Sequence, residues 1–162
     1  MKTFLYRTLL SIIILLIFVS CYKNKNIVIE HSAMMFKNYQ TIEMIKEIDY
    51  IGFSFHHEIY DVIIYHVVNG EINPNFCFDV LMNTGHIQNK SWKQCDCNNP
   101  AINYFPFFNT KKKYKKDVIT SIYNGLSDSN NWYNWITTKD MNHLFLFCPN
   151  DNLLYYVKWN VW

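Results

Sequence analysis

The chain contains very little arginine, glycine or proline. Among its 162 residues Arg7 is the one arginine, and there are four Gly and four Pro. Arginine supplies the planar fork that reads guanine edges and phosphates, so its scarcity disfavours nucleic-acid binding. The four Gly are dispersed along the chain, which excludes a glycine-rich phosphate loop. We therefore expect no nucleic-acid partner, no nucleotide and no cofactor.

The N-terminal segment has the pattern of an export signal. Lys2 and Arg7 precede an uncharged apolar run, residues 9–19, which is shorter than the roughly 20 residues that a membrane-spanning helix needs. The run ends in Phe-Val-Ser-Cys at residues 18–21, which resembles the lipobox of bacterial lipoproteins. The resemblance implies cleavage before Cys21, acylation of that residue by palmitate-type chains, and attachment to a membrane through the lipid.

The resemblance also suggests a cellular location and a division of the chain into a signal peptide, a tether and a domain. Tyr22 stands where an Asp would be the family's inner-membrane retention signal, so the outer membrane, facing the periplasm, is the expected location. The alternatives are an ordinary cleaved signal peptide and an uncleaved anchor helix. We expect a signal peptide at residues 1–20, a lipidated tether at 21–26 and one globular domain at 27–162. Without Lys2 and Arg7, 13 Lys balance 13 Asp and Glu, so the mature net charge is zero.

Four further cysteines suggest disulfides in an exported protein. They are Cys77, Cys95, Cys97 and Cys148. An even number in an oxidising compartment is typical of two disulfides. Cys95 and Cys97 are too close in sequence to pair without distortion, so each should pair with Cys77 or Cys148, and two connectivities remain. A four-thiolate metal site is the alternative, although zinc sites usually show two close cysteine pairs.

The apolar pattern predicts an α+β domain with a small antiparallel sheet and about two helices. Helical spacing appears at residues 32–48 and 117–126. Strand-like runs occupy residues 27–29, 50–55, 62–68, 76–82, 143–148 and 153–159, and the last two flank a turn-forming Pro-Asn-Asp-Asn. We expect helix to cover one face of the sheet and disulfides to brace it.

Two groups of residues are candidates for a functional site. His56, His57 and Glu58, with Asp61 and His66 nearby, form the densest cluster of ligand and acid/base groups, although strand alternation would send His57 to the opposite face. A weak metal or acid/base site competes here with a strand end whose polar side chains are simply satisfied. The aromatic residues of the C-terminal third could form a binding surface or fill the core: Trp132, Tyr133, Trp135, Trp159 and Trp162.

A lysine cluster at residues 111–116 has two interpretations, a solvated surface and a docking patch for anionic lipid or an acidic protein.

These features favour a non-enzymatic, lipid-anchored binding protein of the cell envelope, with a protein as its partner. One specific form is an immunity-type lipoprotein that neutralises a toxin delivered to the envelope. The alternative is an envelope hydrolase or metal-dependent enzyme centred on His56, His57 and Glu58.

Overall fold

A computed structural model describes residues 27–50, 59–78, 91–105, 113–138 and 140–160. Its elements in chain order are α2 (Ile27–Met35), β1 (Phe36–Asn38), β2 (Thr41–Asp49), β3 (Tyr60–Val68), β4 (Glu71–Ile72), β5 (Lys93–Gln94), α3 (Pro100–Tyr104), α4 (Lys113–Ser127), β6 (Trp132–Thr137), β7 (Met141–Cys148), the 3-10 turn η2 (Pro149–Asp151) and β8 (Leu153–Asn160). Among the described residues no helix combines the length and the hydropathy that crossing a bilayer requires.

The architecture is α+β, built on one six-stranded antiparallel sheet, as the sequence predicts. The strand order is β2-β3-β8-β7-β6-β5, and β1 and β4 form a separate two-stranded ribbon. The predicted C-terminal hairpin is confirmed, because β7 and β8 pair along their whole length around η2. Strand β3 and helix α4 also lie where the sequence predicts them.

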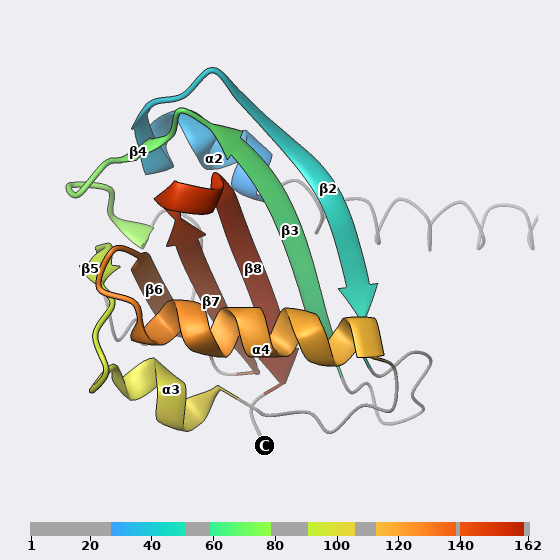
Figure 1. Cartoon of the computed structure of the whole chain (residues 1–162). Helices are drawn as coiled ribbons and strands as arrows, with labels where there is room; N and C mark the ends of the chain where they lie inside the picture. Colours follow the sequence, from blue (N-terminus) through green and yellow to red (C-terminus); the bar gives the residue numbers. More distant parts are fainter. Residues whose placement is uncertain (1–26, 51–58, 79–90, 106–112, 139, 161–162) are drawn as a thin grey trace, which may run out of the picture.

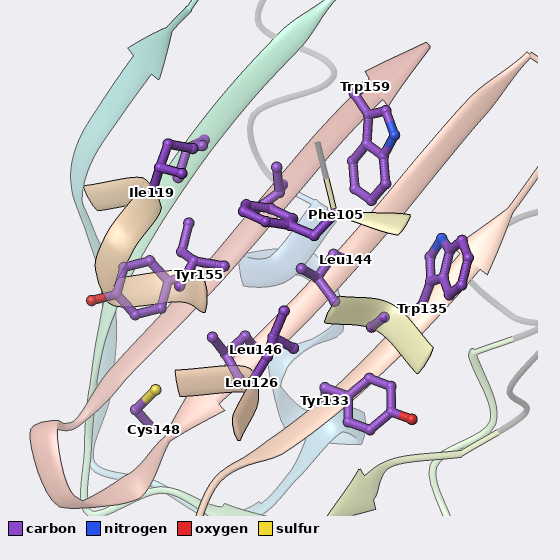
Figure 2. Packing of buried hydrophobic residues seen from close by; sticks show 14 of the residues in the cluster. Phe105, Ile119, Leu126, Tyr133, Trp135, Leu144, Leu146, Cys148, Tyr155 and Trp159 are labelled. Carbon is purple, nitrogen blue, oxygen red and sulfur yellow. The ribbon is translucent and has the colours of Figure 1, made fainter. Parts of the chain in front are cut away.

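Both faces of the sheet are covered, whereas the sequence led us to expect helix on one. Helix α4 crosses one face and α2 lies behind the other (Figure 1). The α4 face buries Ile119, Ile122 and Leu126 of the helix against strand residues such as Leu144 and Leu146 (Figure 2).

The opposite face, called here the α2 face, buries residues of α2 and of the segments around Phe78 and Trp92 against Phe145 and Phe147. Strand side chains alternate between the two faces, and each set removes large apolar area from water.

Two predicted elements near the N-terminus are wrong in type. Residues 27–29 open helix α2 instead of forming a strand, and residues 32–48, predicted as one helix, divide into the end of α2, β1 and the edge strand β2. A bulge between Met44 and Lys46 shifts the register of β2 against β3, so apolar residues recur three and four positions apart as they would on a helix. Residues 76–78, predicted to begin a strand, are not in one, and residues 79–82 lie outside the described part of the chain.

One member of the lysine cluster belongs to the core. Lys115 is buried in the first turns of α4, and its ammonium donates a hydrogen bond to the Asp49 carbonyl and lies 5.0 Å from the centre of the Tyr50 ring. The Tyr50 hydroxyl in turn donates to the Lys115 carbonyl at 2.8 Å. These contacts join the end of β2 to α4, so this lysine is structural.

Candidate functional site

A pocket of about 290 Å³ opens where the C-terminal half of α4 meets the β7–β8 connection. We call it the acidic pocket, and it is lined by Ser121, Asn124 and Gly125 of α4, Asp128 and Asn131 of the following turn, Cys148 of β7, Asp151 of η2 and Tyr155 of β8. Two stretches of chain, residues 121–131 and residues 148–155, therefore meet at one end of the sheet.

Gly125 brings the helix close to the floor of this pocket. A Cβ at this position would lie 2.9 Å from Leu146 Cδ2 and 3.4 Å from Cys148 Sγ, so a side chain here would press on both. Asn131 holds Gly125 in place, because its side-chain amide donates a hydrogen bond to the Gly125 carbonyl at 2.9 Å. The Asn131 backbone carbonyl accepts a hydrogen bond from the Cys95 N–H, also at 2.9 Å. The floor is therefore a rigid junction of helix, turn and strand.

The ionisable groups in the floor are held in their protonated forms. Burial, and then the negative charges of Asp151 and Asp128, raise the pKa of the Cys148 thiol to about 12. Burial, and then Cys148 and Asp151, raise the pKa of the Tyr155 phenol to about 12. Two carboxylates thus act on one buried thiol, and the residues that line the pocket include no Lys, Arg or His.

A second pocket, of about 230 Å³, lies beside Pro149 of η2. Trp132, Phe147, Ile72 and Pro149 supply its apolar wall, with Gly70 and Glu71 completing the lining. The side chains of Trp132 and Phe147 face each other across β6 and β7 in the strand register. This pocket is more apolar than the acidic pocket and contains one carboxylate.

The predicted aromatic surface is divided by the fold. Tyr133, Trp135 and Trp159 are each at most 5% exposed and pack under α4, so the core-filling interpretation describes these three. Trp132 lines the second pocket. Trp162 lies outside the described residues.

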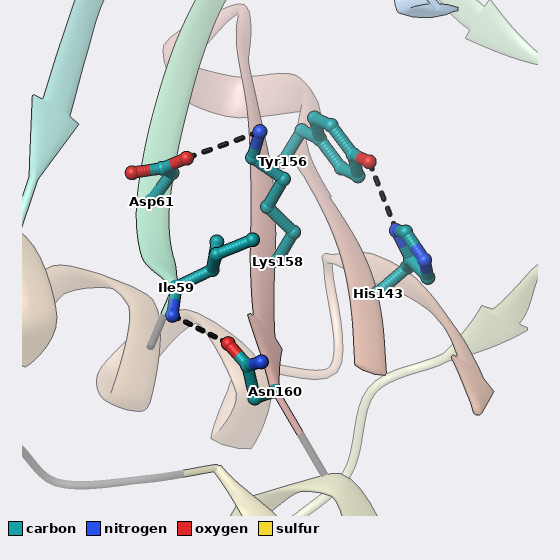
Figure 3. A network of polar contacts seen from close by, with 6 residues as sticks. All are labelled: Ile59, Asp61, His143, Tyr156, Lys158 and Asn160. Atoms are coloured by element: carbon teal, nitrogen blue, oxygen red, sulfur yellow. Dashed lines mark hydrogen bonds and ion pairs between the residues drawn. The ribbon is translucent and has the colours of Figure 1, made fainter. Parts of the chain in front are cut away.

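The α2 face carries a row of polar side chains across three central strands. Asp61 of β3 pairs in register with Lys158 of β8, which pairs in turn with His143 of β7. The Lys158 ammonium lies 3.0 Å from an Asp61 carboxylate oxygen, and His143 Nδ1 lies 2.9 Å from the Tyr156 hydroxyl (Figure 3). At the end of the row, the Asn160 side-chain carbonyl accepts the Ile59 N–H.

Burial governs the protonation of this row. It raises the pKa of the Asp61 carboxyl, against the opposing effect of Lys158. Burial, and then the charge of Lys158, lower the pKa of His143 to about 4. His143 is therefore neutral at neutral pH, stacked on the Tyr156 ring with an interplanar angle of 6°. Because its imidazole is buried, neutral and hydrogen-bonded between packed strands, His143 has a structural role in the sheet.

The histidine cluster of the sequence is not assembled by the described residues. His56, His57 and Glu58 lie outside them. Asp61 belongs to the α2 face, while His66, five positions along the same strand, points to the other face and lies 3.7 Å from the exposed Glu43. Within the described ranges no group of three His, Cys, Asp or Glu side chains could hold a metal ion.

The structure contains no disulfide among the four described cysteines, all of which are free thiols. On one side of Asn131, the Cys95 backbone N–H donates a hydrogen bond to the Asn131 backbone carbonyl. On its other side lies Cys148, because the neighbouring residues Trp132 and Phe147 are paired in the sheet. Two neighbouring strand spacings separate the two Cα atoms by about 10 Å, which exceeds the roughly 4.4–6.8 Å of a disulfide. Cys97 is exposed and Cys77 is half-buried.

Comparison with family models, with curated proteins and with solved structures finds no match to this chain.

Proposed function

We propose that the chain is a lipid-anchored protein of the cell envelope that binds a partner without transforming it. The lipobox at residues 18–21 supports the anchor at Cys21 and, with Tyr22 after it, the outer membrane facing the periplasm. Helix α2 begins at Ile27, so a fully extended tether would reach about 20 Å from the lipidated residue. The binding surfaces of the domain would then stay close to the membrane.

The lining of the acidic pocket is the observation that carries the binding half of this proposal. A catalytic thiol works as a thiolate, and a catalytic acid or base needs a pKa near the working pH. In this pocket Cys148 and Tyr155 have pKa values near 12, so both remain neutral. Neutral hydrogen-bonding groups beside two carboxylates are suited to hold a ligand in place.

The second pocket supports a protein as the partner. Trp132 and Phe147 offer a recessed aromatic site of the kind that receives an anchoring side chain in protein interfaces. An immunity-type lipoprotein, which neutralises a toxin delivered to the envelope, is the specific form that we propose. Such an immunity protein needs attachment to the membrane and a binding surface, and it needs no catalytic group.

Disulfide bracing stays part of the proposal for the envelope. Cys97 is exposed and Cys77 is half-buried, so these are the two thiols that an oxidant reaches most easily. The buried Cys95 and Cys148 would pair only after Asn131 moved from between them. Each disulfide formed would stabilise the domain by about 2–4 kcal/mol.

Fractionation of producing cells tests the anchor. Wild type should sediment with the outer membrane and resist extraction by high salt, whereas Cys21→Ala should lose outer-membrane sedimentation. Cys97→Ala is the matched control, since it also removes one thiol and should still sediment. Recovery of wild type and Cys21→Ala in the same soluble fraction would refute the anchor.

A further inference from the structure

Large apolar side chains that stay exposed are concentrated in the first part of the described chain. Among the described residues six large apolar residues are at least 36% exposed, and Tyr123 of α4 is one of them. The other five belong to α2, to the β1–β2 connection and to β2: Ile29, Met34, Tyr39, Met44 and Ile45. Single exposed apolar residues need no explanation, whereas several in one region mark an interaction surface.

Contacts between elements bring four of these side chains to the same side of the sheet as α2. The Tyr39 hydroxyl oxygen lies 3.1 Å from that of Ser32 in α2, and the ring of Tyr39 packs against Phe36. Met44 pairs in register with Tyr65, whose side chain belongs to the core of the α2 face, so Met44 points to that face as well. Helix α2 also contacts β2. We use the name α2–β2 surface for the exposed side chains of Ile29, Met34, Tyr39 and Met44.

The outer side of α2 is mostly apolar. Its exposed residues repeat at spacings of three and four along one side of the helix, and they are Ile29, Glu30, Ala33 and Met34. A helix on the surface of a globular domain typically carries charged and polar residues on its outer side. This helix has one carboxylate there, so its outer side suits an apolar or interfacial environment.

The length of the tether indicates what lies next to α2. In the proposed function Cys21 carries the lipid, and Ile27, where α2 begins, lies within about 20 Å of it even with the tether fully extended. Helix α2 is about 14 Å long, so all of it remains within reach of the bilayer. The tether contains Lys23 and Lys25, and the exposed Lys37 follows α2. Positive charges on both sides of α2 favour contact with anionic lipid headgroups.

We propose that the α2–β2 surface docks onto the bilayer that holds the lipid anchor, with Ile29 and Met34 at the boundary between headgroups and acyl chains. The inference deepens the proposed function by orienting the domain, and it rests on the anchor at Cys21. A bilayer fits this surface better than a second copy does, because stable dimers bury about 800 Å² on each partner and four partly exposed side chains offer less. The tether makes docking an intramolecular event, so a small apolar surface is sufficient.

Docking in this orientation turns α4 away from the membrane. Helix α4 and α2 lie on opposite sides of the sheet (Figure 1). The α4 side, with the acidic pocket, would therefore face the periplasm. A partner that approaches from the periplasm would meet this side of the domain first.

Hydroxyl-radical footprinting of the full-length acylated protein, on vesicles of phosphatidylethanolamine and phosphatidylglycerol, tests this orientation. Tyr39 and Tyr123 are a matched pair, because they are 36% and 40% exposed and lie beside α2 and on α4. Docking should slow the oxidation of Tyr39 about threefold to tenfold relative to Tyr123, which corresponds to a surface that is docked most of the time. Peptide mass mapping measures both rates.

Two substitutions connect the slower oxidation to the α2–β2 surface. Met34→Glu should bring Tyr39 to about the same rate as Tyr123, because docking would move the new carboxylate out of water. Thr120→Glu is the control, since it adds the same charge at an exposed position of α4 and should keep Tyr39 slow. A difference between the two tyrosines that persists in Met34→Glu, or that is lost in Thr120→Glu, would overturn the inference.

Flotation of the same vesicles separates this inference from the proposed function. Wild type that floats while Tyr39 and Tyr123 are oxidised at equal rates would keep the anchor and overturn the docking. Wild type that does not float would refute the anchor, and the docking with it. A slowing of Tyr39 that grows with the density of protein on the vesicles would indicate a second copy on this surface and would also overturn the inference.

Discussion

Protonation of His143 should make the domain lose stability in mild acid. Burial first, and then the charge of Lys158, lower its pKa from 6.5 to about 4 in the folded protein. The unfolded chain therefore binds a proton at this residue at a higher pH than the folded chain does. The stabilising effect is fully present above about pH 6.5 and is lost as the pH falls through 4.

The magnitude follows from the two pKa values. At about 1.4 kcal/mol per pH unit, the difference between 6.5 and about 4 limits the whole effect to about 3 kcal/mol, of which about 2 kcal/mol is lost by pH 5. Asp61, whose pKa is raised, has the opposite sign: its contribution is present below its unfolded pKa and is lost as the pH rises. Asp61 is present in both the wild type and a His143 variant, so its contribution to the pH dependence of stability cancels when the two proteins are compared.

Urea unfolding followed by tryptophan fluorescence at pH 5 and pH 8 measures this effect. His143→Asn is the chosen variant, because its amide occupies the place of Nδ1 and can keep the hydrogen bond to Tyr156. The wild type should lose about 2 kcal/mol more than the variant between the two pH values. An equal loss in both proteins would refute the assignment of a buried, neutral His143.

Three other outcomes follow from the packing. Lys158→Met should destabilise the domain by about 1–3 kcal/mol because it leaves Asp61 partly buried without its cation, and the double variant with Asp61→Asn should recover most of that loss in urea unfolding. Phe145→Ala should cost about 3–5 kcal/mol in the same assay, since its side chain is fully buried between rings on the α2 face. In the reduced protein, iodoacetamide at pH 8 should alkylate Cys97 within minutes and Cys148 only under denaturing conditions, as peptide mass mapping would show, and fast labelling of native Cys148 would contradict its raised pKa.

Elements with strong local patterns were predictable from the sequence, and elements set by tertiary context were not. Helix α4 and the β7–β8 hairpin have clear periodicity and turn residues, so local rules identify them. Edge strand β2 exposes both faces along most of its length, which removes the alternation, and its bulge at Ile45 imitates helical spacing. Residues 27–29 show that a short β-branched run also begins a helix when packing requires it.

The candidate site was harder to predict than the fold. Its carboxylates, Asp128 and Asp151, stand in turns that look like ordinary loops, and they meet only because β6, β7 and α4 pack together. The tryptophans were candidates for a binding surface by residue type, yet Trp135 and Trp159 belong to the interior. A local sequence pattern contains no signal for such an assembly, because the contacting residues lie far apart along the chain.

Intact mass of the protein purified from its own membranes, beside the same preparation of Cys21→Ala, tests the central claim most directly. The account predicts a chain that begins at Cys21 and carries acyl chains, and it predicts that this added mass disappears in Cys21→Ala. A wild-type chain without acyl mass, whether cleaved or intact at the N-terminus, would contradict the lipid anchor and the envelope function built on it.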